Sequence, residues 1–156
     1  MEEKRAKILR KSLSWITEVK KIIVDTSILI DYVNGYASWV ENIIVAEKKT
    51  TQLVLPTIVI AEYFTSTVLE DEKEVKITNE TFSLFGRQDL NEDIAKILGA
   101  ILRRKSYTPG TGLADLIIAA TAIFFDVPLA TRNRKDFAKI PNLRFFEAEQ
   151  FNKRVH

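Results

Sequence analysis

The feature that most constrains the fold is a run of three β-branched residues at positions 22–24 that ends at Asp25. Such a run is typical of a strand buried on both faces, and apolar residues returning over positions 28–33 predict a helix directly after it. In open α/β sheets ligands bind beyond the carboxyl ends of the strands, so Asp25 is a candidate functional residue. The alternative is that Asp25 caps the helix, although Thr26 and Ser27 are also good capping residues.

Similar strand and helix patterns alternate along the rest of the chain. Strands are predicted over residues 22–24, 51–55, 127–131 and 143–146. Helices are predicted over residues 6–19, 28–33, 39–49, 57–69, 91–105, 113–122 and 147–154, with a charged loop over 70–76. Residues 82–85 fit either a short helix or a strand. This alternation predicts an α/β fold with a mostly parallel central sheet and helices on both faces.

Length and residue usage exclude several classes of protein. A chain of 156 residues suits one domain. The absence of Cys excludes disulfides, thiol catalysis and thiolate metal sites, and the one His, His156, leaves no basis for a catalytic triad or a His-rich zinc site. Because the chain has no apolar run of about 18 residues and begins with charged residues, we expect a soluble cytoplasmic protein without a membrane partner.

The N-terminal segment differs in charge from the rest of the chain. Residues 1–21 carry seven Lys or Arg and three Glu, a net charge of +4, whereas the remaining residues sum to −2. We therefore divide the chain into a basic amphipathic helix over residues 1–20 and a domain over residues 21–156. The basic segment either attracts a polyanion or is an ordinary solvated helix with an excess of Lys.

Asp115 stands in a helical segment that is otherwise apolar. On a helix it lines up with Gly112, Ile118 and Ala119 rather than with a polar face. Desolvating a lone carboxylate costs several kcal/mol, more than the roughly 2 kcal/mol that the helix dipole supplies. We therefore expect a cation or a protein donor beside Asp115.

The predicted topology brings several acids into one crevice. Asp25 and Thr131 follow strands, and the helices that enter the same crevice carry Glu62 and Asp115. Glu62 interrupts an apolar helix, and the alternative is that it faces water. Carboxylates about 4 Å apart repel by roughly 4 kcal/mol per pair, so such a cluster stays ionised only around a cation. With oxygen ligands alone, Mg²⁺ or Mn²⁺ is expected, and such ions assist phosphodiester hydrolysis.

A nucleic-acid substrate would also need cations to hold its backbone. The candidates are the basic N-terminal segment and Arg103, Arg104, Arg132, Arg134 and Lys135.

Four blocks of residues, 22–27, 55–62, 113–122 and 129–137, resemble in order and spacing those of the PIN-domain nucleases, above all the VapC-type ribonuclease toxins. The resemblance covers about residues 21–147. It implies a PIN-like domain, a parallel sheet, an endoribonuclease site that depends on Mg²⁺ or Mn²⁺, inhibition by a cognate antitoxin, and frequent homodimerisation. An RNA substrate and the toxin role in a VapBC-type toxin–antitoxin pair follow from the same resemblance.

The resemblance also implies roles for individual residues. Asp25 and Asp115 would be the principal metal ligands, and Glu62 a further ligand or a group that orients water. Ser27 and Thr131 would support them as hydrogen-bonding groups.

The fourth acid is where the sequence departs from the family. Many members have an acid at the position of Asn133, whereas the nearest carboxylate here is Asp136. We expect Asp136 to complete the catalytic and metal-binding set, with Asn133 as a polar helper. The basic helix before Lys21 is a second departure, because such domains usually begin close to the first acid.

Two other functions remain as alternatives. A catalytically weak PIN-fold module that binds RNA or a protein partner is compatible with Asn133 in place of an acid. Phosphotransfer through Asp25 fits less well, because dehalogenase-type sites need an acid where this chain has Ser27.

Overall fold

The sheet is parallel throughout the part of the chain that the structure describes. The computed structural model describes residues 1–5, 19–46 and 50–149. Its strands are β1 (Lys20–Val24), β2 (Thr51–Pro56), β3 (Gly86–Gln88) and β4 (Leu129–Ala130). Their order is β3-β2-β1-β4, and each neighbouring pair is parallel. The predicted α/β fold with a parallel central sheet is confirmed.

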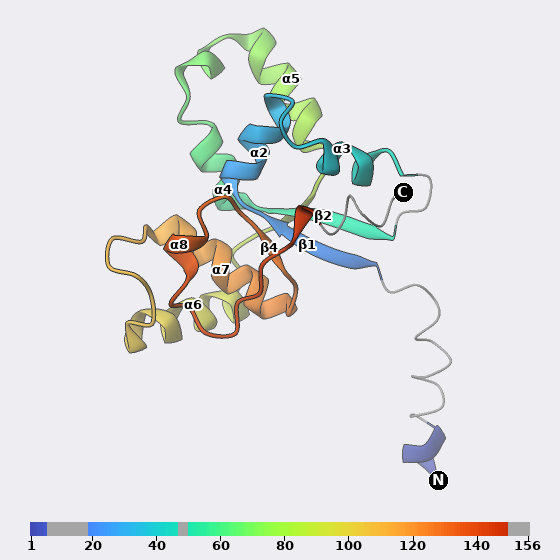
Figure 1. The fold of residues 1–156 in the computed structure, drawn as a ribbon, viewed down its shortest axis with the longest axis vertical. Coiled ribbons are helices and arrows are strands. Elements are labelled where there is room, and N and C mark those ends of the chain that lie inside the picture. The colour runs from blue at the N-terminus through green and yellow to red at the C-terminus, as the bar shows by residue number, and fades with distance from the viewer. Residues whose placement is uncertain (6–18, 47–49, 150–156) are drawn as a thin grey trace.

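Helices lie on either side of this sheet. They are α2 (Thr26–Val33), α3 (Ser38–Ile44), α4 (Thr57–Tyr63), α5 (Glu72–Phe82), α6 (Glu92–Arg104), α7 (Leu113–Phe125) and α8 (Arg134–Phe137). In Figure 1, α2, α3 and α5 lie on one side of the sheet, and α6, α7 and α8 lie on the other. Over the described ranges, none of these helices has both the length and the apolar character that a membrane crossing requires.

The core forms where β1 and β4 meet α7. Ile23 pairs with Leu129 and Val24 with Ala130, and all four side chains are buried. Residues 116–122 of α7 are likewise all buried. Because β2 and β4 flank β1 on opposite sides, the strand order reverses at β1, which is where open α/β sheets form their binding crevice.

The predicted helix over 57–69 was too long. The helix α4 ends at Tyr63, and both the backbone N–H and the hydroxyl of Thr65 donate to the carbonyl of Glu62. Ser66 is then extended, and a short 3₁₀ helix follows over Thr67–Glu70. The capacity of Thr and Ser to bond the backbone locally, which competes with a helix, explains this early end.

The predicted loop over residues 70–76 was wrong, because α5 begins there. Asp71 caps α5 by accepting a 2.8 Å hydrogen bond from the Lys73 N–H, and Glu72 and Glu74 lie in the first turn. Acidic residues favour the positive end of the helix dipole, so this run of charge marks a helix start.

The edges of the sheet also differ from the prediction. β3 begins directly after residues 82–85, whose type the sequence left open. The expected strand over 143–146 is reduced to one parallel bridge between Leu129 and Phe145. The expected helix over 6–19 lies outside the described residues apart from Val19, as does most of the helix expected over 147–154. The division into residues 1–20 and 21–156 therefore stays a prediction.

Candidate active site

Asp25 lies at the carboxyl end of β1 and is held on both of its oxygens. Its Oδ1 accepts a 2.8 Å hydrogen bond from the Thr26 N–H, which makes Asp25 the cap of α2. Its Oδ2 accepts from the hydroxyls of Ser27 at 2.8 Å and Thr131 at 2.7 Å. Only 3% of Asp25 is exposed. The sequence posed capping and a functional role as alternatives, but Asp25 caps α2 while its second oxygen faces the end of β4.

The residues after β4 connect to the same carboxylate. Ser27 accepts a 3.1 Å hydrogen bond from the Arg132 N–H, and the Thr131 hydroxyl accepts one of 3.0 Å from the Asn133 N–H. Each hydroxyl therefore donates to Asp25 while it accepts from the segment that follows β4. This arrangement fixes both hydroxyl protons on Asp25 and sets the orientation of the carboxylate.

Glu62 reaches the site from the last turn of α4. The hydroxyl of Thr26 donates a hydrogen bond to Glu62 Oε2, and Glu62 is half-buried. Thr26 thus contacts two acids, since its N–H bonds Asp25 and its hydroxyl bonds Glu62. From the sequence, Thr26 is expected only as a possible cap. The sequence signal for this double contact is that two hydroxyl residues, Thr26 and Ser27, follow Asp25 directly.

Asp115 lies in the first turn of α7 and is half-buried. Burial is the largest cause that raises the pKa of Asp115 to about 6, and the negative charges of Asp25, Glu62 and Asp136 raise it further. A backbone hydrogen bond at Gly112 acts in the opposite direction. The protein donor expected from the sequence is therefore present, but it does not offset burial and repulsion.

Two residues are candidates for the fourth place in the site, Asp136 and Asn133. Asp136, on α8, is exposed and close enough to Asp115 to raise its pKa. Asn133 contacts Thr131 through its backbone N–H. The structure thus brings Asp25, Glu62, Asp115 and Asp136 into one electrostatic cluster, which we call the acidic cluster.

The donor set of the acidic cluster suits a hard divalent ion. Four carboxylates without nitrogen or sulfur ligands match the preference of Mg²⁺ and Mn²⁺. Three of the roughly four acceptor positions of Asp25 are used by the protein, which leaves one on Oδ1 for a further partner. Within residues 1–5, 19–46 and 50–149, no three carboxylates stand in an arrangement that holds a metal ion as they are.

Two of the cations that the sequence suggested for substrate binding form ion pairs within the protein. Arg132 pairs with Asp31 at 3.1 Å. Arg134 pairs with Glu147 at 2.8 Å and donates to the carbonyl of Phe146 at 3.2 Å. Sequence alone does not reveal these pairs, because they join segments that meet only in the fold.

Comparison with known proteins agrees with the fold. The PIN-domain family profile matches residues 22–143. Ribonuclease VapC19 of Mycobacterium tuberculosis is 30% identical over 125 residues, which is 78% of this chain and 96% of that protein.

Two solved structures show the same fold. VapBC2 from Rickettsia felis, bound to a promoter DNA fragment, has a TM-score of 0.64 at 24% identity and covers 81% of this chain and 97% of its own. A toxin–antitoxin complex from Klebsiella pneumoniae has a TM-score of 0.56 at 29% identity, over 78% of this chain and 94% of its own. With the profile match and the VapC19 relative, these likenesses establish that the chain belongs to the PIN-domain family, among its VapC-like members.

Proposed function

We propose that this protein is an endoribonuclease that depends on Mg²⁺ or Mn²⁺ and acts as the toxin of a VapBC-type pair. The observation that carries the proposal is the acidic cluster, in which hydrogen bonds orient Asp25 and Glu62. Burial, and then the charges of Asp25, Glu62 and Asp136, raise the pKa of Asp115 in this cluster. Uncompensated negative charge of this kind is a common property of sites that recruit a cation and perform hydrolysis. The name of the VapC19 relative supports RNA as the substrate.

Asp25 and Asp115 would hold the ion, with Glu62 and Asp136 as further ligands or as groups that orient water. The chemistry that such an ion supplies is positive charge beside the phosphate and a lower pKa for water. Asp25 is suited to its role because three donors fix its orientation before any ligand arrives. Glu62 is held in the same way by Thr26.

The partners follow from the relatives rather than from contacts in this chain. The solved neighbours are VapBC and toxin–antitoxin complexes, which supports a cognate antitoxin as the partner. We further propose that the protein forms a homodimer and acts in the cytoplasm, where RNA and the antitoxin are both available.

Cleavage of a labelled single-stranded RNA tests the enzymatic proposal. We expect cleavage in Mn²⁺ or Mg²⁺, none in EDTA, and a loss of about 100-fold or more in Asp25→Asn and Asp115→Asn. Asp93→Asn is the matched control, because Asp93 also lies in the first turn of a helix, α6, but outside the acidic cluster. Cleavage that persists in EDTA or in Asp115→Asn would contradict the proposal.

Growth and calorimetry separate the toxin from the binding module. We expect wild-type expression to arrest growth and Asp115→Asn expression to leave it unaffected. Titration calorimetry should show Mn²⁺ binding that Asp115→Asn abolishes. No Mn²⁺ binding together with no cleavage would favour a module that binds RNA or protein without catalysis.

A further inference from the structure

Exposed cations gather at the end of α6 and on the segment that contains α8. They are Arg103, Arg104, Lys105, Lys135 and Lys139, and we call them the basic face. Among the described residues, none of the five forms an ion pair with a carboxylate, whereas Arg132, Arg134, Arg144 and Lys96 are all paired. The basic face is therefore free to bind an external anion.

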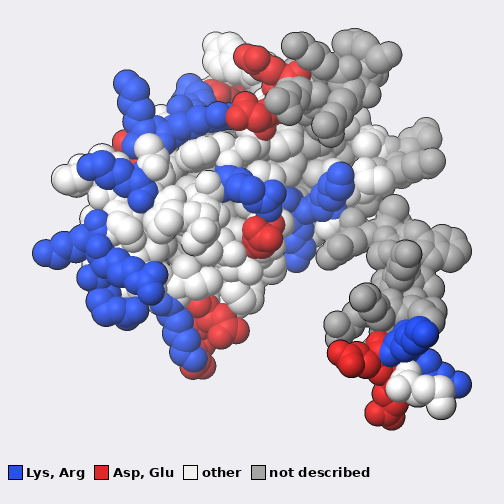
Figure 2. Space-filling view, turned by 60° about the horizontal axis from the view of Figure 1, so that its bottom comes forward, with Lys and Arg blue, Asp and Glu red and all other residues white. Residues whose placement is uncertain are grey.

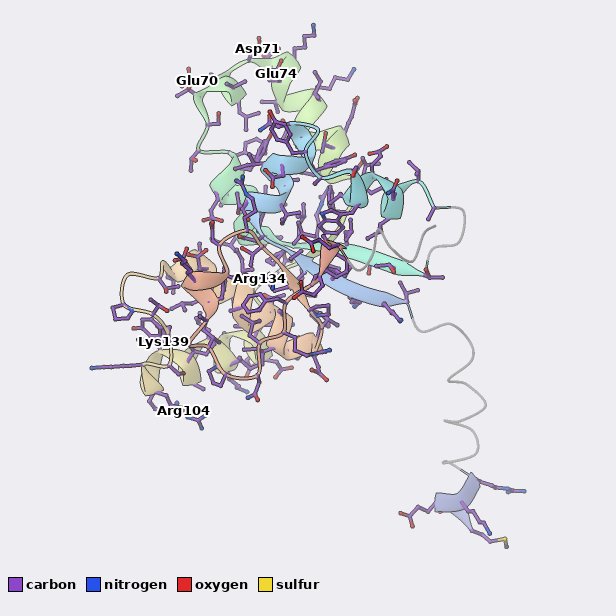
Figure 3. All side chains as sticks on the ribbon, in the orientation of Figure 1. Glu70, Asp71, Glu74, Arg104, Arg134 and Lys139 are labelled. Carbon is purple, nitrogen blue, oxygen red and sulfur yellow. The ribbon has the colours of Figure 1, made fainter. Side chains whose placement is uncertain are left out.

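Two hydrogen bonds join the elements that carry the basic face. The loop after α6 contacts α8 through the Thr111 hydroxyl, which donates to the Asp136 carbonyl at 3.0 Å, and the Thr108 hydroxyl, which donates to the Lys135 carbonyl at 3.4 Å. The sticks in Figure 3 place Arg104 and Lys139 in the same part of the molecule, far from Glu70, Asp71 and Glu74. The segments that carry these cations are thus held to one another.

The space-filling view agrees with this arrangement. In Figure 2, where the lower part of the molecule is turned forward, Lys and Arg side chains gather along one side of the visible surface, with few acidic side chains between them. Such a surface concentrates positive potential and attracts polyanions.

The basic face also adjoins the acidic cluster. Asp136 lies directly after Lys135 on α8, three residues before Lys139, and its charge acts on Asp115. A phosphodiester that approaches four carboxylates is repelled unless cations nearby offset that repulsion. The basic face supplies positive charge beside the acidic cluster.

We propose that the basic face binds the phosphates of single-stranded RNA next to the acidic cluster, and so positions the strand for cleavage; this rests on the proposed function. The five cations are spread over two elements and a loop, which suits a polymer with one charge per residue better than a single compact anion. Contacts of this type position a strand without reading its sequence.

Fluorescence anisotropy with a labelled oligo-uridine and a mixed-sequence RNA tests the inference. The measurement is made in EDTA, so that binding is observed without cleavage. Arg104→Ala/Lys139→Ala should weaken binding of both RNAs by about tenfold and reduce the slope of log affinity against log salt by about 1.4, since each phosphate contact contributes about 0.7. The double variant must keep the wild-type circular dichroism and thermal midpoint, because Arg104 also lies at the carboxyl end of α6.

Lys73→Ala/Lys76→Ala is the matched control. Both lysines are exposed on α5, beside the acidic residues at the opposite end of the molecule, and the double variant removes the same charge. It should bind RNA within about twofold of the wild type, because loss of distant charge is largely screened.

Each outcome decides one of the two proposals. If Arg104→Ala/Lys139→Ala and the wild type have equal RNA affinity and equal salt slope, the proposal that the basic face binds RNA is overturned, even if the wild type cleaves RNA. If RNA binding depends on Arg104 and Lys139 but the protein never cleaves RNA, RNA binding by the basic face is supported and the proposed nuclease activity is overturned. Binding of polyglutamate, but not of RNA, through these cations would assign the surface to an acidic protein partner and overturn our inference.

Discussion

The Thr131 hydroxyl donates a 2.7 Å hydrogen bond to Asp25, a residue 106 positions earlier in the chain. Both residues directly follow strands, β4 and β1, which pair in parallel and end at the same edge of the sheet. The contact therefore follows from the sheet topology. Through it, a residue late in the sequence helps to orient the carboxylate of Asp25.

We expect Thr131→Val to weaken both the fold and the site. The variant keeps the shape of the side chain but removes a hydrogen bond to a buried carboxylate, which should lower the free energy of unfolding by about 1–2 kcal/mol. Thr131→Ser retains the hydroxyl and should behave as the wild type. Urea denaturation measures the stability, and RNA cleavage measures the site; equal stability of the Val and Ser variants would contradict the expectation.

The contribution of Asp115 to the stability of the metal-free protein should fall as pH rises from about 4 to about 6. The pKa of Asp115 is about 6 in the fold and 3.8 without it, so the folded state binds the extra proton in this window. Ionisation therefore costs stability, by about 1 kcal/mol once partial exposure is allowed for. Asp115→Asn should remove this loss and be more stable than the wild type at pH 7 in EDTA. Thermal melts at several pH values check this, with Asp93→Asn retaining the wild-type profile.

Thr26→Val should reduce metal affinity without unfolding the protein. The variant keeps the N–H that bonds Asp25 but loses the hydroxyl that holds Glu62. Partners that hold a ligand in this way affect metal affinity by about 10- to 100-fold. Mn²⁺ titration calorimetry should show weaker binding for Thr26→Val and recovery in Thr26→Ser; unchanged binding in both would show that Glu62 needs no partner.

The pKa of Asp115 distinguishes the roles of Asp136 and Asn133. Asp136→Asn should lower the pKa of Asp115, because it removes one of the charges that raise it. Asn133→Ala should leave that pKa unchanged, since Asn133 contacts Thr131 through its backbone N–H, which the substitution retains. Nuclear magnetic resonance of the Asp115 carboxyl carbon measures both. A larger shift in Asn133→Ala would reverse the two roles.

The parts of the fold that the sequence predicts well are those where one pattern dominates. The β-branched run before Asp25 and residues 116–122 of α7 are buried throughout, in agreement with their apolar sequence pattern. The predicted helix start at Asn91 is confirmed, since Asn91 accepts a 2.9 Å hydrogen bond from the Ile94 N–H.

The rest depends on contacts that no local pattern contains. The end of α4 is determined by Thr65, whose hydroxyl takes up a backbone carbonyl, and α5 begins within a charged run that resembles a loop. Thr26 gained its role from Glu62, which arrives from another helix. Arg132 and Arg134 are removed from the set of free cations by partners distant in sequence. Tertiary structure decides each of these cases.

The pairing of β4 with β1 has a consequence for the order of events during synthesis. A nascent chain that stops before β4 leaves one edge of β1 unpaired and Asp25 without its hydroxyl donor from Thr131. The contact forms only after residue 131 has been made. For a protein that we propose to cut RNA, the carboxylate of Asp25 is therefore held on all three of its donors only in the last stage of folding.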